Sequence, residues 1–245
     1  MSAEQATEAM RSGRRRGGRA NARRRAVPAA PDAHVEAAIP SRPRTRPAGV
    51  RTRIIACGAL AREIGALQRG NDWQHLDLVC LPATLHNTPD AIPEAVRQRV
   101  REARADGIEI ILVAYGDCGT GGRLDRVCEE EGVERINGPH CYAFFDGLDA
   151  FAARSEEEIG AFYLTDFLVR QFETLVWRGL GLDRGPELRE MMFAHYDRVV
   201  FLAQTEDADL TRRAEDAARR LGLPLERRFT GFGGLASALA TVASR

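Results

Sequence analysis

The sequence predicts an α/β fold: a doubly wound, mostly parallel sheet with helices on both faces and a helical insertion. Short apolar segments rich in β-branched residues alternate with segments of helical periodicity, which indicates βαβ units. The segment 108–115, IEIILVAY, is an almost continuous apolar run, as expected for a strand buried on both faces. Hydrophobic residues make up 44% of the 245 residues, enough for a substantial core. No segment reaches the roughly 20 apolar residues of a membrane span.

Residues 1–49 differ in composition from the rest of the chain. Residues 1–50 hold eleven Arg and four acidic residues, and the segment RSGRRRGGRANARRR has no hydrophobic period. Such a composition predicts a disordered, Arg-rich tail, followed by a single α/β domain over 50–245. The tail also has features of a transit peptide and of an arm that contacts nucleic-acid phosphates. We favour an unstructured tail or a start site placed too far upstream, and nucleic acid is not an expected partner.

The first part of the domain contains four predicted strands with three predicted helices between them. The helix over 93–107 has Pro93 in its first turn and Gly107 at its end, both typical positions. The expected strands are 53–57 (RIIAC), 76–83 (LDLVCLPA), 108–115 and 133–136 (VERI), and the helices between them are 58–69, 93–107 and 121–132.

The second part begins with a long predicted helix over 155–182. Ser155 followed by Glu158 matches a capping box, and Asp166 and Arg170, four residues apart, are expected to form an ordinary ion pair on the helix surface. Two arrangements remain open: one domain of two similar halves, or one large sheet with a helical insertion. The remaining expected elements are helices at 185–197, 207–223 and 233–244 and strands at 198–204 and 225–232.

The chain has five cysteines. Their odd number, the absence of CxxC pairs and the lack of a secretory signal argue against a disulfide framework and predict a cytoplasmic protein. Cys80 lies within a predicted strand and Cys128 within a predicted helix, so both are interpreted as small buried core residues.

The other three cysteines follow predicted strands. Cys57, Cys118 and Cys141 each come where a strand ends, and His86 follows the second strand. The carboxyl ends of parallel strands share one edge of a sheet, where ligands bind. Thiolates and imidazoles are the ligands that zinc prefers. We therefore predict a metal site with Cys57, Cys118, Cys141 and His86 as ligands. Zinc is the expected metal, an iron–sulfur cluster is the alternative metal centre, and a core role for each thiol is the alternative to a site.

Neighbouring residues are assigned to the same site. His140 is expected to act as a general base or a further ligand, and Asp117 and Tyr115 to orient an open coordination position. The glycine-rich turns GTGG and GFGGL precede helices and offer backbone N–H groups to a phosphate, but neither fits a nucleotide-binding motif. The glycines expected to let a cofactor or neighbouring loops approach closely are Gly58, Gly116, Gly119 and Gly121.

Five segments carry a resemblance to a known family: IIACGAL, LPATLHNTP, VAYGDCGTG, GPHCYAFF and FYLTDFLVRQF. In this order they resemble the family catalogued as domain of unknown function 1638, over roughly Arg51 to the C-terminus. Genes of that family occur in bacteria and methanogenic archaea beside corrinoid proteins and corrinoid-dependent methyltransferases. The resemblance therefore implies a role in corrinoid-dependent one-carbon metabolism, without implying a particular reaction.

Two functions follow as hypotheses. The first is a zinc-dependent enzyme of methyl or one-carbon transfer that acts on a small-molecule substrate with a corrinoid supplied by a partner protein. The second is a non-catalytic carrier of metal or cofactor that serves a corrinoid protein or methyltransferase. Turnover of a methyl donor with the corrinoid protein distinguishes them. No membrane partner is expected.

Overall fold

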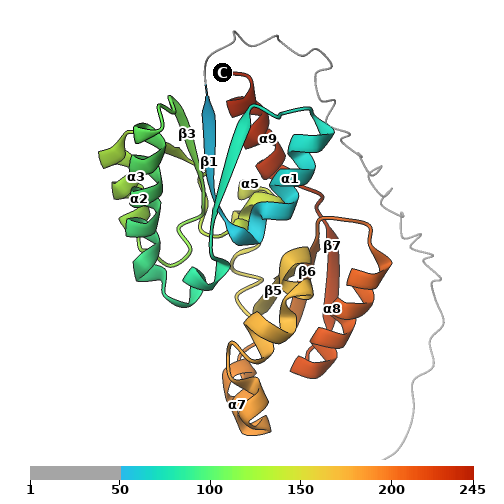
Figure 1. The fold of residues 1–245 in the computed structure, drawn as a ribbon. Coiled ribbons are helices and arrows are strands. Elements are labelled where there is room, and N and C mark those ends of the chain that lie inside the picture. Colours follow the sequence, from blue (N-terminus) through green and yellow to red (C-terminus); the bar gives the residue numbers. More distant parts are fainter. Residues whose placement is uncertain (1–50) are drawn as a thin grey trace, which may run out of the picture. The chain divides into compact units, whose positions relative to one another are not determined.

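The structure, a computed structural model, describes residues 51–245, so the predicted tail over 1–49 lies outside the described residues. The predicted parallel α/β fold is confirmed (Figure 1). Its strands divide between a four-stranded sheet and a three-stranded sheet, as in the expected arrangement of two halves. All strand pairs in both sheets are parallel.

The first sheet has the strand order β2-β1-β3-β4. Thr52 at the start of β1 is in register with Leu76 on one side and Ile110 on the other, so the carboxyl ends of β1, β2 and β3 lie at one edge. The four strands are β1 (Thr52–Cys57), β2 (Leu76–Leu81), β3 (Ile110–Ala114) and β4 (Glu134–Arg135).

Helices cover both faces of the first sheet because successive strand residues point to opposite sides. Ile55 and Val113 pack on one face in a core with α2 and α3, whereas Ile54 and Leu112 pack on the other with α1 and α9. Figure 1 shows the two helix pairs on either side of β1 and β3. These helices are α1 (Ala61–Gly70), α2 (Ile92–Ala105), α3 (Arg123–Glu131) and α9 (Gly233–Ala243).

The second sheet has the order β5-β6-β7. One face, including Leu164 and Phe201, packs against α6, η4, α7 and α8, and the other face, including Val200 and Leu202, contacts Tyr142. The elements of this half are β5 (Ala161–Thr165), α6 (Asp166–Arg170), η4 (Phe172–Trp177), η5 (Leu182–Arg184), α7 (Pro186–Phe193), β6 (Arg198–Ala203), α8 (Ala208–Leu221) and β7 (Leu225–Phe229).

The prediction of one helix over 155–182 is wrong. β5 lies within this segment, where Ala161 to Thr165 pair in parallel with β6, and the short α6 and the π-helical η4 follow. Pairing with β6, a long-range interaction, overrides the local helical periodicity. The Ser155 hydroxyl donates to the Ala152 carbonyl, 2.7 Å away, at the end of α5, so the predicted capping box does not form.

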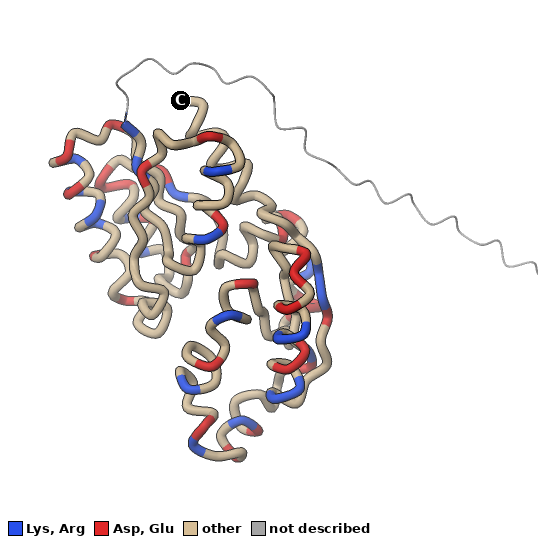
Figure 2. Tube along the Cα trace, turned by 45° about the vertical axis from the view of Figure 1, so that its right-hand side comes forward, with Lys and Arg blue, Asp and Glu red and all other residues tan. Residues whose placement is uncertain are grey.

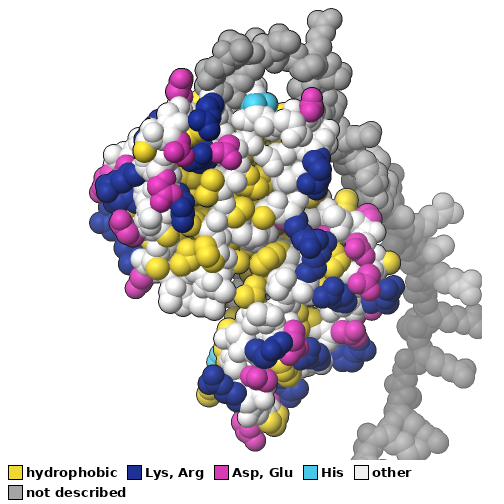
Figure 3. Space-filling model, in the orientation of Figure 1, with side chains coloured by type: hydrophobic (Ala, Val, Ile, Leu, Met, Phe, Trp, Pro, Cys, Tyr) yellow, Lys and Arg dark blue, Asp and Glu magenta, His cyan; other side chains and the backbone are white. Residues whose placement is uncertain are grey.

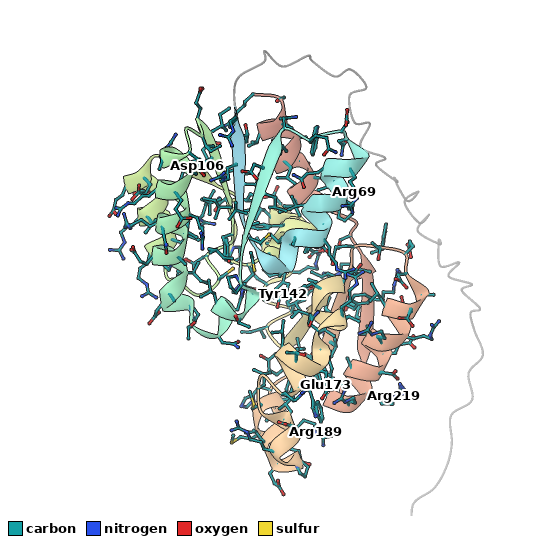
Figure 4. All side chains as sticks on the ribbon, viewed as in Figure 1. Arg69, Asp106, Tyr142, Glu173, Arg189 and Arg219 are labelled. Carbon is teal, nitrogen blue, oxygen red and sulfur yellow. The ribbon has the colours of Figure 1, made fainter. Side chains whose placement is uncertain are left out.

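Two helices that the sequence did not indicate connect the sheets: α4 (Cys141–Asp146) and α5 (Leu148–Arg154). Phe144 and Phe145 of α4 join the core of the first sheet with α9. Tyr142 stacks on Tyr163 of β5 with ring centroids 5.2 Å apart, and Figure 4 shows Tyr142 beside that strand. α4 therefore packs against both sheets.

Charged residues alternate along the outer helices (Figure 2). In α8, for example, Arg212 pairs with Asp209 and Arg219 with Asp216. None of the helices that the structure describes has the length and apolar character needed to cross a membrane.

The prediction that Cys80 is buried is wrong. β2 is an edge strand, so no further strand covers its outer side, and the Cys80 side chain is exposed. Hydrophobic side chains gather on this part of the surface (Figure 3). Cys128 is buried in the core beneath α2 and α3, as predicted.

Candidate functional site

Cys57 ends β1 and lies next to His86. Its thiol is buried and accepts a hydrogen bond from the Ala59 N–H at 3.5 Å, so it caps the short helix η1 (Gly58–Leu60). His86 comes from η2 (Ala83–Asn87), which follows β2. Its Nδ1 is 3.8 Å from the Cys57 sulfur. The carboxyl edge of the first sheet thus holds one contact between a thiol and an imidazole, which come from the ends of β1 and β2.

Cys118 lies in the turn that follows β3. Its backbone has φ 50°, a left-handed conformation that is rare for a residue with a side chain. Its N–H donates to the Pro139 carbonyl at 2.8 Å, and its buried thiol lies near the backbone N–H groups of Gly116 and Cys141, which favour the thiolate form. The turn after β3 is therefore bound to the segment before α4, and the Cys118 thiol lies at the N-terminus of that helix.

The Asp117 carboxylate is bound within its own turn. It accepts from the Thr120 hydroxyl at 2.7 Å, from the Gly122 N–H at 2.8 Å and from the Gly121 N–H at 3.1 Å. Partial burial raises its pKa, but these donors outweigh burial and bring the pKa to about 2. Asp117 thus shapes the turn before α3, and its oxygens face this turn.

Tyr115 directly follows β3 and is 1% exposed. Its hydroxyl has no hydrogen-bond partner of standard geometry. Burial, followed by the neighbouring Cys57 thiol, raises its pKa far above the ordinary value, so it stays protonated. The hydroxyl lies beside the Cys57 thiol, and its capacity to donate a hydrogen bond favours the thiolate form of Cys57.

The predicted glycines serve close packing and turns. A Cβ at Gly116 would lie 2.9 Å from the backbone of His140, and one at Gly58 would lie 3.0 Å from the Leu81 carbonyl. Gly119 and Gly121 have φ +84° and +62°, values that favour glycine. Gly58 and Gly116 therefore let the loops of neighbouring strands touch.

The thiols at this edge are protonated at neutral pH in the metal-free protein. Burial, and then the proximity of Cys57, raises the pKa of Cys118 to about 11. Burial also raises the pKa of Cys57, and that of Cys141 well above the ordinary value. His86 and His140 are exposed overall, yet packing around their rings lowers the pKa of both. The imidazoles are consequently neutral and able to act as ligands.

The chain matches the family described as "Protein of unknown function (DUF1638)" over residues 80–239. It belongs to this family. No curated protein and no solved structure matches it. The DUF1638 match includes His86, Cys118 and Cys141, whereas Cys57 lies before it.

The thiols and imidazoles at this edge of the DUF1638 chain are ligand types that suit zinc, but they do not lie close enough together to surround one ion. Within residues 51–245, no three His, Cys, Asp or Glu residues lie close enough together to hold a metal ion. The Cys57–His86 contact is one pair, and the Cys118 thiol near the N-terminus of α4 is a second feature. A third ligand would require these loops to move towards each other.

A second group of polar residues lies at the carboxyl edge of the second sheet, and the sequence interpretation missed it. Asp166 follows β5 and is 0% exposed, so the predicted ion pair with Arg170 forms but does not lie on the helix surface as expected. Its carboxylate accepts from the Gln204 N–H at 3.1 Å and from the Thr205 hydroxyl at 2.6 Å, and Arg170 lies 3.5 Å away. A signal existed in the sequence: Asp166 and Gln204 both come directly after strands.

Proposed function

We propose that this DUF1638 protein binds zinc at the carboxyl edge of the first sheet and acts in corrinoid-dependent methyl or one-carbon transfer. The observation that supports zinc is the contact between Cys57 and His86, whose Sγ and Nδ1 are 3.8 Å apart, at an edge that also holds Cys118 and Cys141. Cys57 ends β1, and the other three residues follow β2, β3 and β4 in the sequence, at the edge where ligands bind in such folds.

The state of the thiols argues against a free nucleophile and is compatible with a metal. Reactive cysteines have a lowered pKa, whereas burial raises the pKa of Cys57, Cys118 and Cys141. A bound cation would stabilise their thiolates. In this proposal Cys57 and His86 form the first pair of ligands, and Cys118 and Cys141 complete the set.

His140 and Tyr115 supply the groups around such an ion. His140 is exposed at the start of α4 and its neutral ring is suited to accept a proton from a substrate. Tyr115 supplies a buried hydroxyl beside the Cys57 thiol. Zinc itself would activate a bound thiol or water as a nucleophile.

The corrinoid connection rests on the family resemblance alone. It makes a corrinoid protein or corrinoid methyltransferase the proposed partner and a small methylated molecule the proposed substrate. A carrier of metal or cofactor for the same system is the alternative.

The test begins with full-length protein purified without oxygen. Elemental analysis should give about one zinc per chain, with no visible absorption. An iron–sulfur cluster or bound corrinoid would appear as visible colour. Calorimetric zinc titration of the apoprotein should release protons, because thiols with raised pKa must ionise, and zinc affinity should therefore increase from pH 6 to pH 8. Absence of zinc together with undetectable zinc affinity would contradict the proposal.

A second measurement distinguishes the enzyme from the carrier. Zinc-loaded protein is mixed with a methylated corrinoid protein, and loss of the methylcobalt absorption is followed with and without candidate methyl acceptors. Loss of the absorption only in the presence of zinc-loaded protein supports an enzyme. Stable zinc binding without any change supports a carrier.

A further inference from the structure

A cavity of about 420 Å³ lies between α1 and the carboxyl edge of the second sheet. This volume lies in the range of roughly 300–1,000 Å³ that is typical of small-molecule sites. Arg62, Ala66 and Arg69 line it from one face of α1, with a spacing of four and three residues. Figure 4 labels Arg69 on this helix. The cavity is completed by Ala61, Glu63, Arg170, Thr205 and Phe232.

The three arginines make this cavity attractive to an anion. Arg62 and Arg69 are exposed, and neither side chain forms an ion pair within residues 51–245. Arg170 is held 3.5 Å from the buried Asp166, which also accepts from the Thr205 hydroxyl. Asp166 thus positions Arg170 and Thr205 while its own oxygens are already paired. Arginine side chains gather on this part of the surface (Figure 3), and guanidinium groups bind carboxylates and phosphates through paired hydrogen bonds.

Glu63 adds a hydrogen-bond acceptor to this cationic cavity. Its side chain is buried at 4% exposure, it lines the cavity, and its Oε2 has no hydrogen-bond partner. A buried oxygen without a partner is costly, so it points to a group that the ligand supplies. Burial raises the pKa of Glu63, although Arg170 and Arg62 oppose this shift.

We propose that this cavity binds a small dianion that carries its own hydrogen-bond donor, such as hydrogen phosphate or a hydroxydicarboxylate. Arg62, Arg69 and Arg170 hold the anionic oxygens, and the Glu63 oxygen accepts from the donor. An anion of similar charge that lacks a donor would leave the Glu63 oxygen without a hydrogen bond. The negative charge of Glu63 would then repel that anion. The cavity therefore selects hydrogen phosphate over sulfate, and malate over succinate.

This site does not depend on zinc, so its failure and that of the proposed function are separable.

The test uses full-length, metal-free protein at pH 7.5 and isothermal titration with phosphate, sulfate, malate and succinate. Phosphate and malate should bind at least about tenfold more tightly than sulfate and succinate, the difference expected for one hydrogen bond to a charged group. Arg62→Ala/Arg69→Ala should weaken binding of all four anions by at least tenfold. Both arginines are exposed, so the fold should be retained.

Two variants complete the design. Glu63→Gln keeps the size of the side chain and removes its charge, so the preference for phosphate and malate should fall to less than threefold while binding persists. Arg126→Ala removes an exposed arginine of α3 outside the cavity and should leave every affinity unchanged. If none of the four anions binds at about 10 mM, a concentration that would detect even a weak complex, the proposal is overturned. Equal affinities for the paired anions in the wild type, or equal losses in Arg126→Ala and the double variant, would also overturn it.

Discussion

Cys118 and Cys128 provide two buried thiols with similar exposure, 6% and 4%, in different surroundings. Cys118 lies in the turn after β3 at the carboxyl edge of the first sheet, and its thiol contacts the N-terminus of α4. Cys128 lies on α3 and packs in the core with α2. The raised pKa of both thiols, about 11, therefore does not separate a ligand from a core residue, whereas their position in the fold does.

We expect Cys118→Ser to lose most of the bound zinc, and Cys128→Ser to retain it. Both substitutions bury a hydroxyl in place of a thiol and should each lower the free energy of unfolding of the metal-free protein by about 1–3 kcal/mol. Zinc content after purification without oxygen, together with chemical denaturation, measures both effects. Equal zinc content in the two variants would make Cys118 a bystander.

Asp117 illustrates a residue whose structural role is clear from its hydrogen bonds. Asp117→Ala removes the acceptor of three donors before α3 and should lower the free energy of unfolding at pH 7 by about 1–2 kcal/mol, as for the loss of a helix cap. The folded pKa of Asp117, about 2, is below its unfolded value, so its contribution is complete above about pH 4 and is lost as the pH falls towards 2.

Denaturation of wild type and Asp117→Ala at several pH values checks this expectation. Asp117→Asn, which keeps one acceptor oxygen, serves as the control and should show an intermediate loss. A difference between wild type and Asp117→Ala that persists undiminished at pH 2 would contradict the assigned role of the carboxylate.

At the level of helices and strands, a set of buried charges joins α4 to the second sheet. Arg228 of β7 donates to Asp146 of α4 at 3.1 Å and to Glu158 at 2.6 Å. The two carboxylate side chains are only 3% and 5% exposed, and Arg154 also binds Asp146 while Tyr163 donates to Glu158. Because Cys141 begins α4, this set also fixes the helix that presents Cys141 and His140.

Replacing Arg228 by Met should lower the free energy of unfolding by about 3 kcal/mol, because two buried carboxylates lose a partner. Arg212→Met is a matched control on α8: Arg212 pairs with Asp209 at the surface, with side chains 67% and 61% exposed, and its loss should cost less than about 1 kcal/mol. Urea denaturation of both variants measures the difference. Similar losses would show that burial of these charges has no special effect.

Across the described chain as a whole, the last helix belongs to the first sheet. α9 follows β7 of the second sheet, yet its side chains Leu235, Leu239 and Val242 are buried with Ile54 and Leu60. The chain therefore closes the core of its first half only when its final residues are in place. The N-terminal Arg-rich segment has no apolar pattern that could contribute in the same way.

Two truncations should consequently have opposite outcomes. Deleting residues 1–49 should leave the melting temperature nearly unchanged, whereas deleting 232–245 should prevent folding. The second deletion exposes a core face that loses three buried side chains, worth roughly 1.5–3 kcal/mol each. Thermal unfolding followed by circular dichroism checks both. A large loss of stability in the N-terminal deletion would show that this segment packs on the domain.

Local patterns in the sequence were enough to predict the parallel α/β fold, the strands of the first sheet and the family. IILVA is apolar throughout because β3 is covered on both faces, and Cys57, Cys118 and Cys141 lie at or after the ends of strands that must share an edge. The helical position of Cys128 likewise identified it correctly as a core residue. The metal site at that edge stays a prediction.

Which segments pair and which groups meet became clear from tertiary contacts. AFYLT has a helical pattern on either side of it and becomes a strand because β6 lies beside it. Cys80 is exposed because β2 is the edge strand, a matter of strand order. The cavity residues of α1, such as Glu63, lie far along the sequence from Asp166 and Arg170, so no local spacing could reveal that the Glu63 Oε2 would be buried without a partner. Burial and pairing depend on long-range contacts, and the tertiary structure brings Glu63 of α1, Arg170 and Thr205 to one cavity.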